Sequence, residues 1–120
     1  MNILRLQQSF KDAWHGVKYV YKHEQNFKIQ LFLGLIVVIF MLALELKKSE
    51  MVVLLLLILL VLILELLNSA LEKFVDILKP RMHLQVALVK DIMAAMVLLA
   101  SLGSILIGGL IFYPYLISYL

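Results

Sequence analysis

Three long apolar runs dominate the pattern of hydrophobic and polar positions along the chain, at residues 27–46, 51–78 and 84–116. At about 1.5 Å per residue, a helix of some 20 residues crosses the roughly 30 Å hydrocarbon layer of a membrane. The sequence Lys79-Pro80-Arg81 interrupts the pattern between the second run and the third, because proline continues a helix poorly. The pattern therefore predicts three transmembrane helices.

Residues 1–26 show a different, amphipathic pattern. Their apolar side chains recur at helical spacing on one narrow stripe, and basic and polar side chains occupy the opposite face. The stripe includes a tryptophan, a residue that favours the membrane interface: Ile3, Leu6, Phe10, Trp14, Val17 and Tyr21. We expect a surface helix that lies flat on an anionic membrane, with packing against the chain's own spans as the alternative.

Composition supports the membrane assignment. Of the 120 residues, 64% are hydrophobic and 16% are charged, so lipid must be the solvent for most of the chain. The absence of cysteine excludes disulfides, thiolate metal sites and cysteine nucleophiles. The net charge of +3 fits the bias of cytoplasmic loops better than a nucleic-acid footprint, and we expect no nucleic-acid partner.

The distribution of basic residues predicts the orientation in the membrane. Nine of the eleven Lys and Arg residues lie either before position 29 or between Lys73 and Lys90, and the other two lie in the turn after the first span. By the positive-inside rule, the N-terminus and the second connection are cytoplasmic. We expect one multi-pass domain over residues 1–120 in the cytoplasmic membrane.

Acidic and amide side chains form a stripe on the second predicted helix. Glu65, Asn68, Glu72 and Asp76 occupy positions i, i+3, i+7 and i+11, which lie on one side of a helix. The apolar run from Met51 has only 14 residues before Glu65, so the helix must continue past this residue to cross the membrane. Glu65 is therefore expected inside the hydrocarbon layer, near its exit face.

Carboxylates gathered at this depth repel one another and are costly to bury, so a cation, a proton or a function must compensate. Magnesium prefers carboxylate oxygens and substrate phosphates, and it is often held by one or two protein carboxylates. Lys90 and Asp91 open the third span at the same face, near Glu24 and Lys28. These are the parts that phosphoryl transfer requires, although no Walker-type glycine loop is present.

At these residues the sequence resembles the bacterial integral-membrane family of diacylglycerol kinases and undecaprenol kinases. The resemblance covers nearly the whole chain. It rests on the run Glu-Leu-Leu-Asn-Ser-Ala-Leu-Glu at 65–72, followed by Val75-Asp76 and Lys90-Asp91, with Ala13, Gly16, Glu24 and Phe27 upstream.

This resemblance implies an all-α membrane protein, with an N-terminal amphipathic surface helix and three transmembrane helices, that assembles as a homotrimer. It implies ATP-dependent phosphorylation of a membrane lipid alcohol, diacylglycerol or undecaprenol, at the cytoplasmic face of the bacterial inner membrane. Magnesium would be the metal, with ATP as phosphate donor.

The resemblance also implies roles for individual residues. Glu65 would be the general base that takes the proton of the lipid hydroxyl, and Glu24 and Glu72 would be the magnesium ligands. The residues implied in nucleotide and phosphate binding are Asn68, Asp76, Lys90 and Asp91.

Some positions depart from the family pattern or divide between its branches. Residues 92–96 are bulkier than the glycine- and alanine-rich run usual there. The segments 24–28 and 111–114 look more like the undecaprenol-type branch, whereas Ser69 looks more like the diacylglycerol-type branch. The acceptor lipid is left open.

Two other functions are compatible with acids at membrane depth. One is a small transporter or proton-relay subunit, and the other is a structural assembly factor. The gathering of the acidic residues at one membrane face, with none in mid-span, favours the kinase over a relay.

Overall fold

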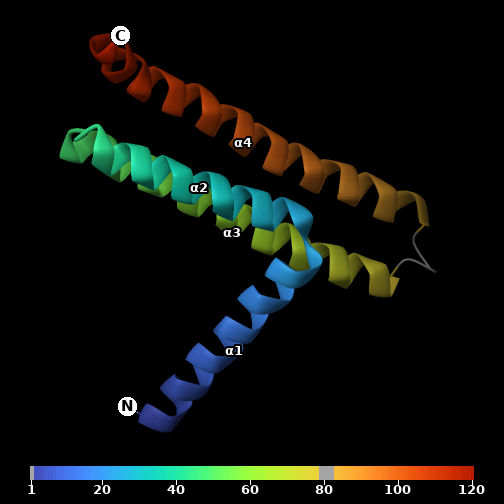
Figure 1. Ribbon diagram of the computed structural model, residues 1–120. Helices are drawn as coiled ribbons and strands as arrows, with labels where there is room; N and C mark the ends of the chain where they lie inside the picture. The colour runs from blue at the N-terminus through green and yellow to red at the C-terminus, as the bar shows by residue number, and fades with distance from the viewer. Residues whose placement is uncertain (1, 79–82) are drawn as a thin grey trace.

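The computed structural model describes residues 2–78 and 83–120, which form four α-helices and no strand (Figure 1). Helix α1 covers Ile3–His23, α2 covers Gln25–Ala43, α3 covers Lys48–Leu78 and α4 covers His83–Tyr119. This confirms the predicted all-α fold with one amphipathic leading helix and three long apolar ones. The break predicted at Lys79-Pro80-Arg81 lies outside the described residues.

Helix α1 leaves the other three helices at a steep angle and contacts α2 and α3 near its C-terminal end (Figure 1). It begins at Asn2, whose side-chain oxygen accepts hydrogen bonds from the backbone N–H of Leu4 and Arg5 at 3.1 and 3.3 Å. Phe10 and Trp14 on its apolar stripe are 70% and 63% exposed. An uncovered apolar stripe is the arrangement that an interfacial helix needs, so a membrane-surface location stays our prediction for α1.

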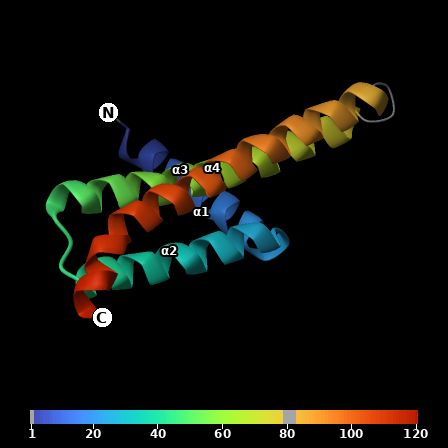
Figure 2. The same cartoon turned by 90° about the horizontal axis from the view of Figure 1, so that it is seen from above.

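Helices α2, α3 and α4 are each long and apolar enough to cross a membrane. Helix α2 has 19 residues and is about 28 Å long, close to the thickness of the hydrocarbon layer. Helices α3 and α4 extend beyond the start of α2 at one end of the bundle (Figure 2). Helix α3 is central, because both α2 and α4 pack against it.

The end of α2 is set by a Schellman motif. The N–H of Leu46 donates to the carbonyl of Met41 at 3.3 Å, and the N–H of Glu45 donates to that of Leu42 at 3.4 Å. Glu45 has φ of 53°, in the left-handed region where glycine is usual. Leu46 then packs on Met41 and Leu54, so the helix stops at Ala43, before the expected end at residue 46.

Close approach between α2 and α3 depends on Gly34. A Cβ at this position would lie 3.0 Å from Ile58 Cγ2, which is tighter than ordinary van der Waals contact. Gly34 is buried, so α3 covers it where the two helices meet. This contact brings the N-terminal half of α2 onto α3, and it thereby fixes where the start of α2 lies relative to the acidic stripe.

Candidate functional site

Acidic side chains gather where α1, the start of α2 and the C-terminal part of α3 meet. They line a cleft of about 380 Å³, which we call the acidic cleft. Besides three carboxylates it contains a lysine, a tyrosine and a serine: its lining residues are Tyr19, Glu24, Ser69, Glu72, Lys73, Asp76 and Ile77. All of these lining residues except Ile77 carry polar or charged groups, as a site for a charged ligand requires.

Glu24 owes its position to the junction between α1 and α2. It is the single extended residue between the two helices, with φ of −113° and ψ of 108°. Its N–H donates to the carbonyl of Val20 at 2.8 Å, which closes α1. The Ser69 hydroxyl of α3 donates to Glu24 Oε1 at 3.5 Å. The break between the helices therefore turns this carboxylate towards α3.

Glu65 lies in a separate hollow between α2, α3 and α4, which we call the Glu65 cleft. Its volume is about 350 Å³, and it is lined by Asn26, Gln30, Glu65, Asn68, Ala94, Val97, Leu98 and Ser101. Glu65 is 4% exposed, and its Oε1 atom has no hydrogen-bond partner among the described residues. A buried carboxylate oxygen without a partner is costly, and such atoms are a mark of functional sites.

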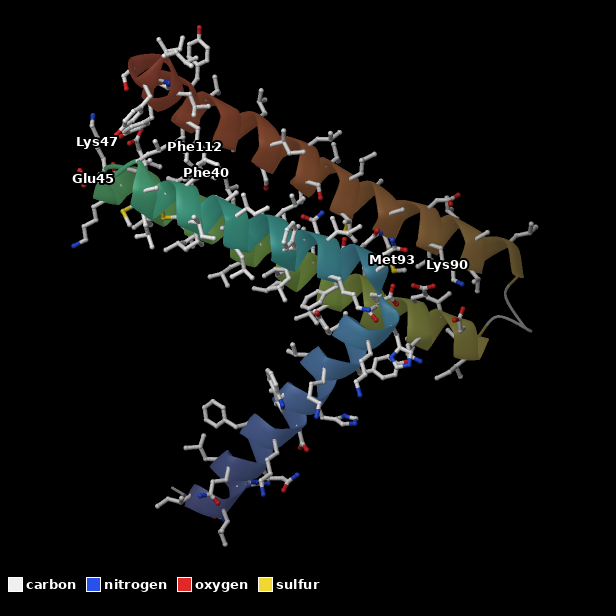
Figure 3. All side chains as sticks on the ribbon, viewed as in Figure 1. Phe40, Glu45, Lys47, Lys90, Met93 and Phe112 are labelled. Atoms are coloured by element: carbon white, nitrogen blue, oxygen red, sulfur yellow. The ribbon has the colours of Figure 1, made fainter. Side chains whose placement is uncertain are left out.

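Lys90 of α4 closes the other side of the site. Its Nζ lies 2.7 Å from Asp76 Oδ1 and also interacts electrostatically with Glu72. Figure 3 shows Lys90 at the end of the bundle opposite Glu45 and Lys47. The bundle therefore carries charged side chains at both ends and mostly apolar side chains between them, as a membrane-spanning bundle requires.

Lys73 supplies a second positive charge in the acidic cleft. Its Nζ lies 4.5 Å from the centre of the Tyr19 ring, a cation–π contact between α3 and α1. The charges of Asp76 and Glu24 also act on it. The acidic cleft therefore contains a lysine as well as carboxylates, so it offers groups of both charges to a ligand that carries both phosphate and a metal ion.

The structure divides the predicted site residues into two neighbouring groups. Glu24, Glu72 and Asp76 line the acidic cleft, and Asp76 connects Lys90 to it. Glu65 and Asn68 line the Glu65 cleft. Asp91 follows Lys90 on α4, is exposed and lines neither cleft.

The donor set suits magnesium. No group of three or more His, Cys, Asp or Glu side chains in the described part of the chain is arranged as a metal site. Glu24 and Glu72, however, line one open cleft together with the Ser69 hydroxyl. Magnesium is often held by one or two carboxylates, with water and substrate phosphate completing its coordination. Two carboxylates in an open cleft fit that pattern.

Three residues whose contacts shape the site could not be assigned a role from the sequence. Ser69 is 3% exposed and bonded to Glu24, and it lies one turn from both Glu65 and Glu72 within the acidic run, a signal that points to it. Tyr19 meets Lys73 from another helix. Gln30 Nε2 donates to Ser101 Oγ at 3.2 Å between α2 and α4. These last two contacts join distant parts of the chain, and periodicity within one helix carries no signal for them.

Comparison with known proteins assigns the family. The family model for prokaryotic diacylglycerol kinase matches residues 11–112, which include both clefts and Lys90. A curated relative, the diacylglycerol kinase of Synechocystis sp. (strain ATCC 27184 / PCC 6803 / Kazusa), is 39% identical over 111 residues. The match covers 92% of this chain and spans 63% of the length of that relative. The chain therefore belongs to the prokaryotic diacylglycerol kinase family.

Proposed function

We propose that this protein is a lipid kinase that transfers the γ-phosphate of ATP to the hydroxyl of diacylglycerol at the cytoplasmic face of the bacterial membrane. The observation that carries the proposal is the buried Glu65 carboxylate, whose Oε1 atom has no hydrogen-bond partner among the described residues, beside an open cleft with three further carboxylates. Family membership and the name of the relative support diacylglycerol as the acceptor. Undecaprenol is the alternative acceptor with which diacylglycerol must be compared.

Glu65 is the proposed general base. Its cleft lies between three apolar helices, where a lipid hydroxyl can arrive from the membrane without passing through water. The Oε1 atom, which no described residue contacts by a hydrogen bond, would accept the proton of that hydroxyl as the new bond to phosphorus forms. Asn68 lines the same cleft and would orient the reacting groups through its amide.

The acidic cleft is the proposed nucleotide site. Glu24 and Glu72 would hold magnesium, which when bound neutralises phosphate charge and orients the phosphates for transfer. Lys90 would contact the transferring phosphate, held over the end of α3 by Asp76. Asp91 would act on the nucleotide from its exposed position on α4. Ser69 lies one helical turn from Glu65 and donates its hydrogen bond to Glu24, so the two clefts adjoin each other.

The depth of the site follows from helix geometry. If α3 enters the hydrocarbon layer near Met51, a rise of about 1.5 Å per residue brings it out some 20 residues later. Glu65 is then inside the layer, and Glu72 and Asp76 lie at its boundary. With the N-terminus cytoplasmic, as the basic residues indicate, this boundary faces the compartment that contains ATP. The homotrimer is part of this proposal and is supported by the resemblance.

A phosphate-transfer assay tests the proposal. Purified protein in phosphatidylcholine vesicles is given radiolabelled ATP, magnesium, and diacylglycerol and undecaprenol in equal amounts. We expect label in phosphatidic acid, loss of transfer when EDTA removes the metal, and recovery when magnesium is restored.

The assay also separates the competing functions. Preferential labelling of undecaprenol would keep the kinase and change its acceptor. Absence of transfer to either lipid, together with ion flux in vesicles that contain no nucleotide, would favour the transporter or proton relay instead.

A further inference from the structure

An apolar hollow of about 280 Å³ runs along the bundle between α2 and α4, with α3 as its floor. No backbone contact joins α2 to α4 in the described residues, and both helices pack against α3. We call this hollow the apolar groove. Small and aliphatic side chains form most of its wall, including Gly34, Val37, Leu54, Ile58, Gly109 and Phe112.

The apolar groove is continuous with the Glu65 cleft. Gln30 and Ser101 line both hollows, and the hydrogen bond between them, 3.2 Å from Gln30 Nε2 to Ser101 Oγ, crosses the place where the two meet. A molecule in the groove would therefore reach Glu65 at one end. Its polar lining residues are Gln30, Ser101 and Ser104, which lie at or within one helical turn of the end that joins the candidate site, and the rest of its lining is apolar.

The length of the groove corresponds to one leaflet. Along α4 its lining runs from Ser101 to Phe112, a rise of about 16 Å, which is half of the roughly 30 Å hydrocarbon layer. Figure 3 shows Phe112 near the end of the bundle opposite Lys90. The groove thus starts beside Glu65 and runs into the membrane, as the hydrocarbon chain of a lipid does from its head.

Ser104 adds a polar group to this wall. Its hydroxyl is buried and has no hydrogen-bond partner among the described residues, although it lines the groove one turn beyond Ser101. An unpartnered buried hydroxyl is unfavourable unless a ligand satisfies it. A ligand oxygen close to the head of a lipid chain would lie at this depth, and the ester carbonyl of a glycerolipid is such an oxygen.

We propose that the apolar groove binds one acyl chain of the acceptor lipid, with the Ser104 hydroxyl donating a hydrogen bond to its ester carbonyl. The inference rests on the proposed kinase function and identifies the part of the acceptor that is recognised. Lipid tails are as apolar as the groove, so chain burial alone gives little preference over bulk membrane. Shape and the Ser104 hydrogen bond therefore select a diacylglycerol over a polyprenol, which has no ester.

Filling the groove tests its shape. A Cβ at Gly109 or at Gly103 would meet no described atom within 4 Å, but only Gly109 lines the groove. Gly109→Leu should raise the KM for a long-chain diacylglycerol about tenfold or more and leave the KM for a short-chain diacylglycerol unchanged. Gly103→Leu is the matched control and should change neither. The proposal would be overturned if Gly109→Leu and Gly103→Leu had the same KM for the long-chain acceptor. It would also be overturned if Gly109→Leu raised the KM for the long-chain and the short-chain acceptor equally.

Ser104→Ala is a milder variant, because it removes only an oxygen atom that has no partner within the described chain. We expect its KM for a diester acceptor to rise about fivefold, the equivalent of one ordinary hydrogen bond. The KM for the dialkyl ether analogue, which has no carbonyl, should stay at the wild-type value. Equal effects on ester and ether, or no effect on either, would contradict the role of Ser104.

A binding measurement separates this inference from the proposed function. Diacylglycerol with a photoreactive group in mid-chain is illuminated with the wild-type protein in phosphatidylcholine vesicles, and the labelled residues are mapped. Labelling at the groove that excess diacylglycerol removes supports the inference even if no phosphate is transferred. Uniform labelling of the lipid-facing surface would overturn it, as would disulfide formation between two Gly109→Cys chains, which would show that a second copy covers the groove.

Discussion

Lys90 of α4 and Asp76 of α3 form a salt bridge in which 2.7 Å separates Lys90 Nζ from Asp76 Oδ1. Both side chains are partly exposed, so the pair contributes little to folding stability. Its importance is geometric, because it holds the Lys90 charge over the end of α3 towards Glu72. In the proposed mechanism, a lysine placed in this way would meet a phosphate group in the acidic cleft.

Asp76→Asn tests this positioning role. Without the aspartate charge, Lys90 is held less firmly, and we expect a several-fold rise in the KM for ATP with little change in the KM for lipid. Lys90→Met removes the charge itself and should reduce kcat as well. Initial rates over a range of ATP concentrations measure both. Asp12→Asn, on the exposed face of α1, is the matched control; an effect equal to that of Asp76→Asn would contradict the assignment.

The hydrogen bond from Ser69 to Glu24 predicts an effect on metal binding. Ser69→Ala removes the hydroxyl that holds Glu24 against α3, so the half-saturating magnesium concentration should rise several-fold. Magnesium titration of the transfer rate measures this change. Ser49→Ala, at an exposed position near the start of α3, should leave it unaltered. A fall in rate that excess magnesium does not restore would show that Ser69 acts elsewhere.

The turn between α2 and α3 offers a prediction about stability. Glu45 has φ of 53°, where a Cβ is strained and glycine is not. Glu45→Gly should therefore raise the free energy of unfolding in mixed micelles by about 1 kcal/mol without altering the transfer rate. Lys47→Gly, at a position where the backbone is not left-handed, should lower it instead. A loss of stability in Glu45→Gly would contradict the Schellman geometry.

At the same end of the bundle, Tyr115 of α4 donates a hydrogen bond to Glu50 of α3. This bond attaches the end of α4 to the start of α3, so Tyr115→Phe should lower the melting temperature in detergent. The transfer rate at low temperature should be preserved, because the bond lies far from the acidic cleft. Tyr113→Phe alters an exposed side chain and should have no such effect. Equal melting temperatures for the two variants would show that the hydrogen bond between Tyr115 and Glu50 does not contribute to thermal stability.

Much of the fold was predictable because the membrane imposes a simple rule on the sequence. A helix that crosses lipid must be apolar over most of its length, and the three segments show this without reference to any tertiary contact. The ends of the helices were less predictable. Helix α2 stops at Ala43 through a left-handed glutamate, and Pro114 lies inside α4, although neither residue is typical of its position.

The candidate site was predictable along one helix and not between helices. Helical spacing placed Glu65, Glu72 and Asp76 on one stripe, as α3 has them. That spacing does not reveal that the stripe borders two clefts, because the start of α2 brings Gln30 to Ser101 of α4. It also does not reveal the groove, which exists because α2 and α4 pack on α3 without backbone contact between the two in the described chain.

The most direct measurement is the phosphate-transfer rate of Glu65→Gln. The amide keeps the size of the side chain but cannot take a proton, so the account predicts that kcat falls at least about 100-fold. The KM values and the oligomeric state should match those of the wild type, and Glu45→Gln, at the other end of the bundle, should transfer normally. A Glu65→Gln protein that transfers phosphate to diacylglycerol at the wild-type rate would contradict the central claim.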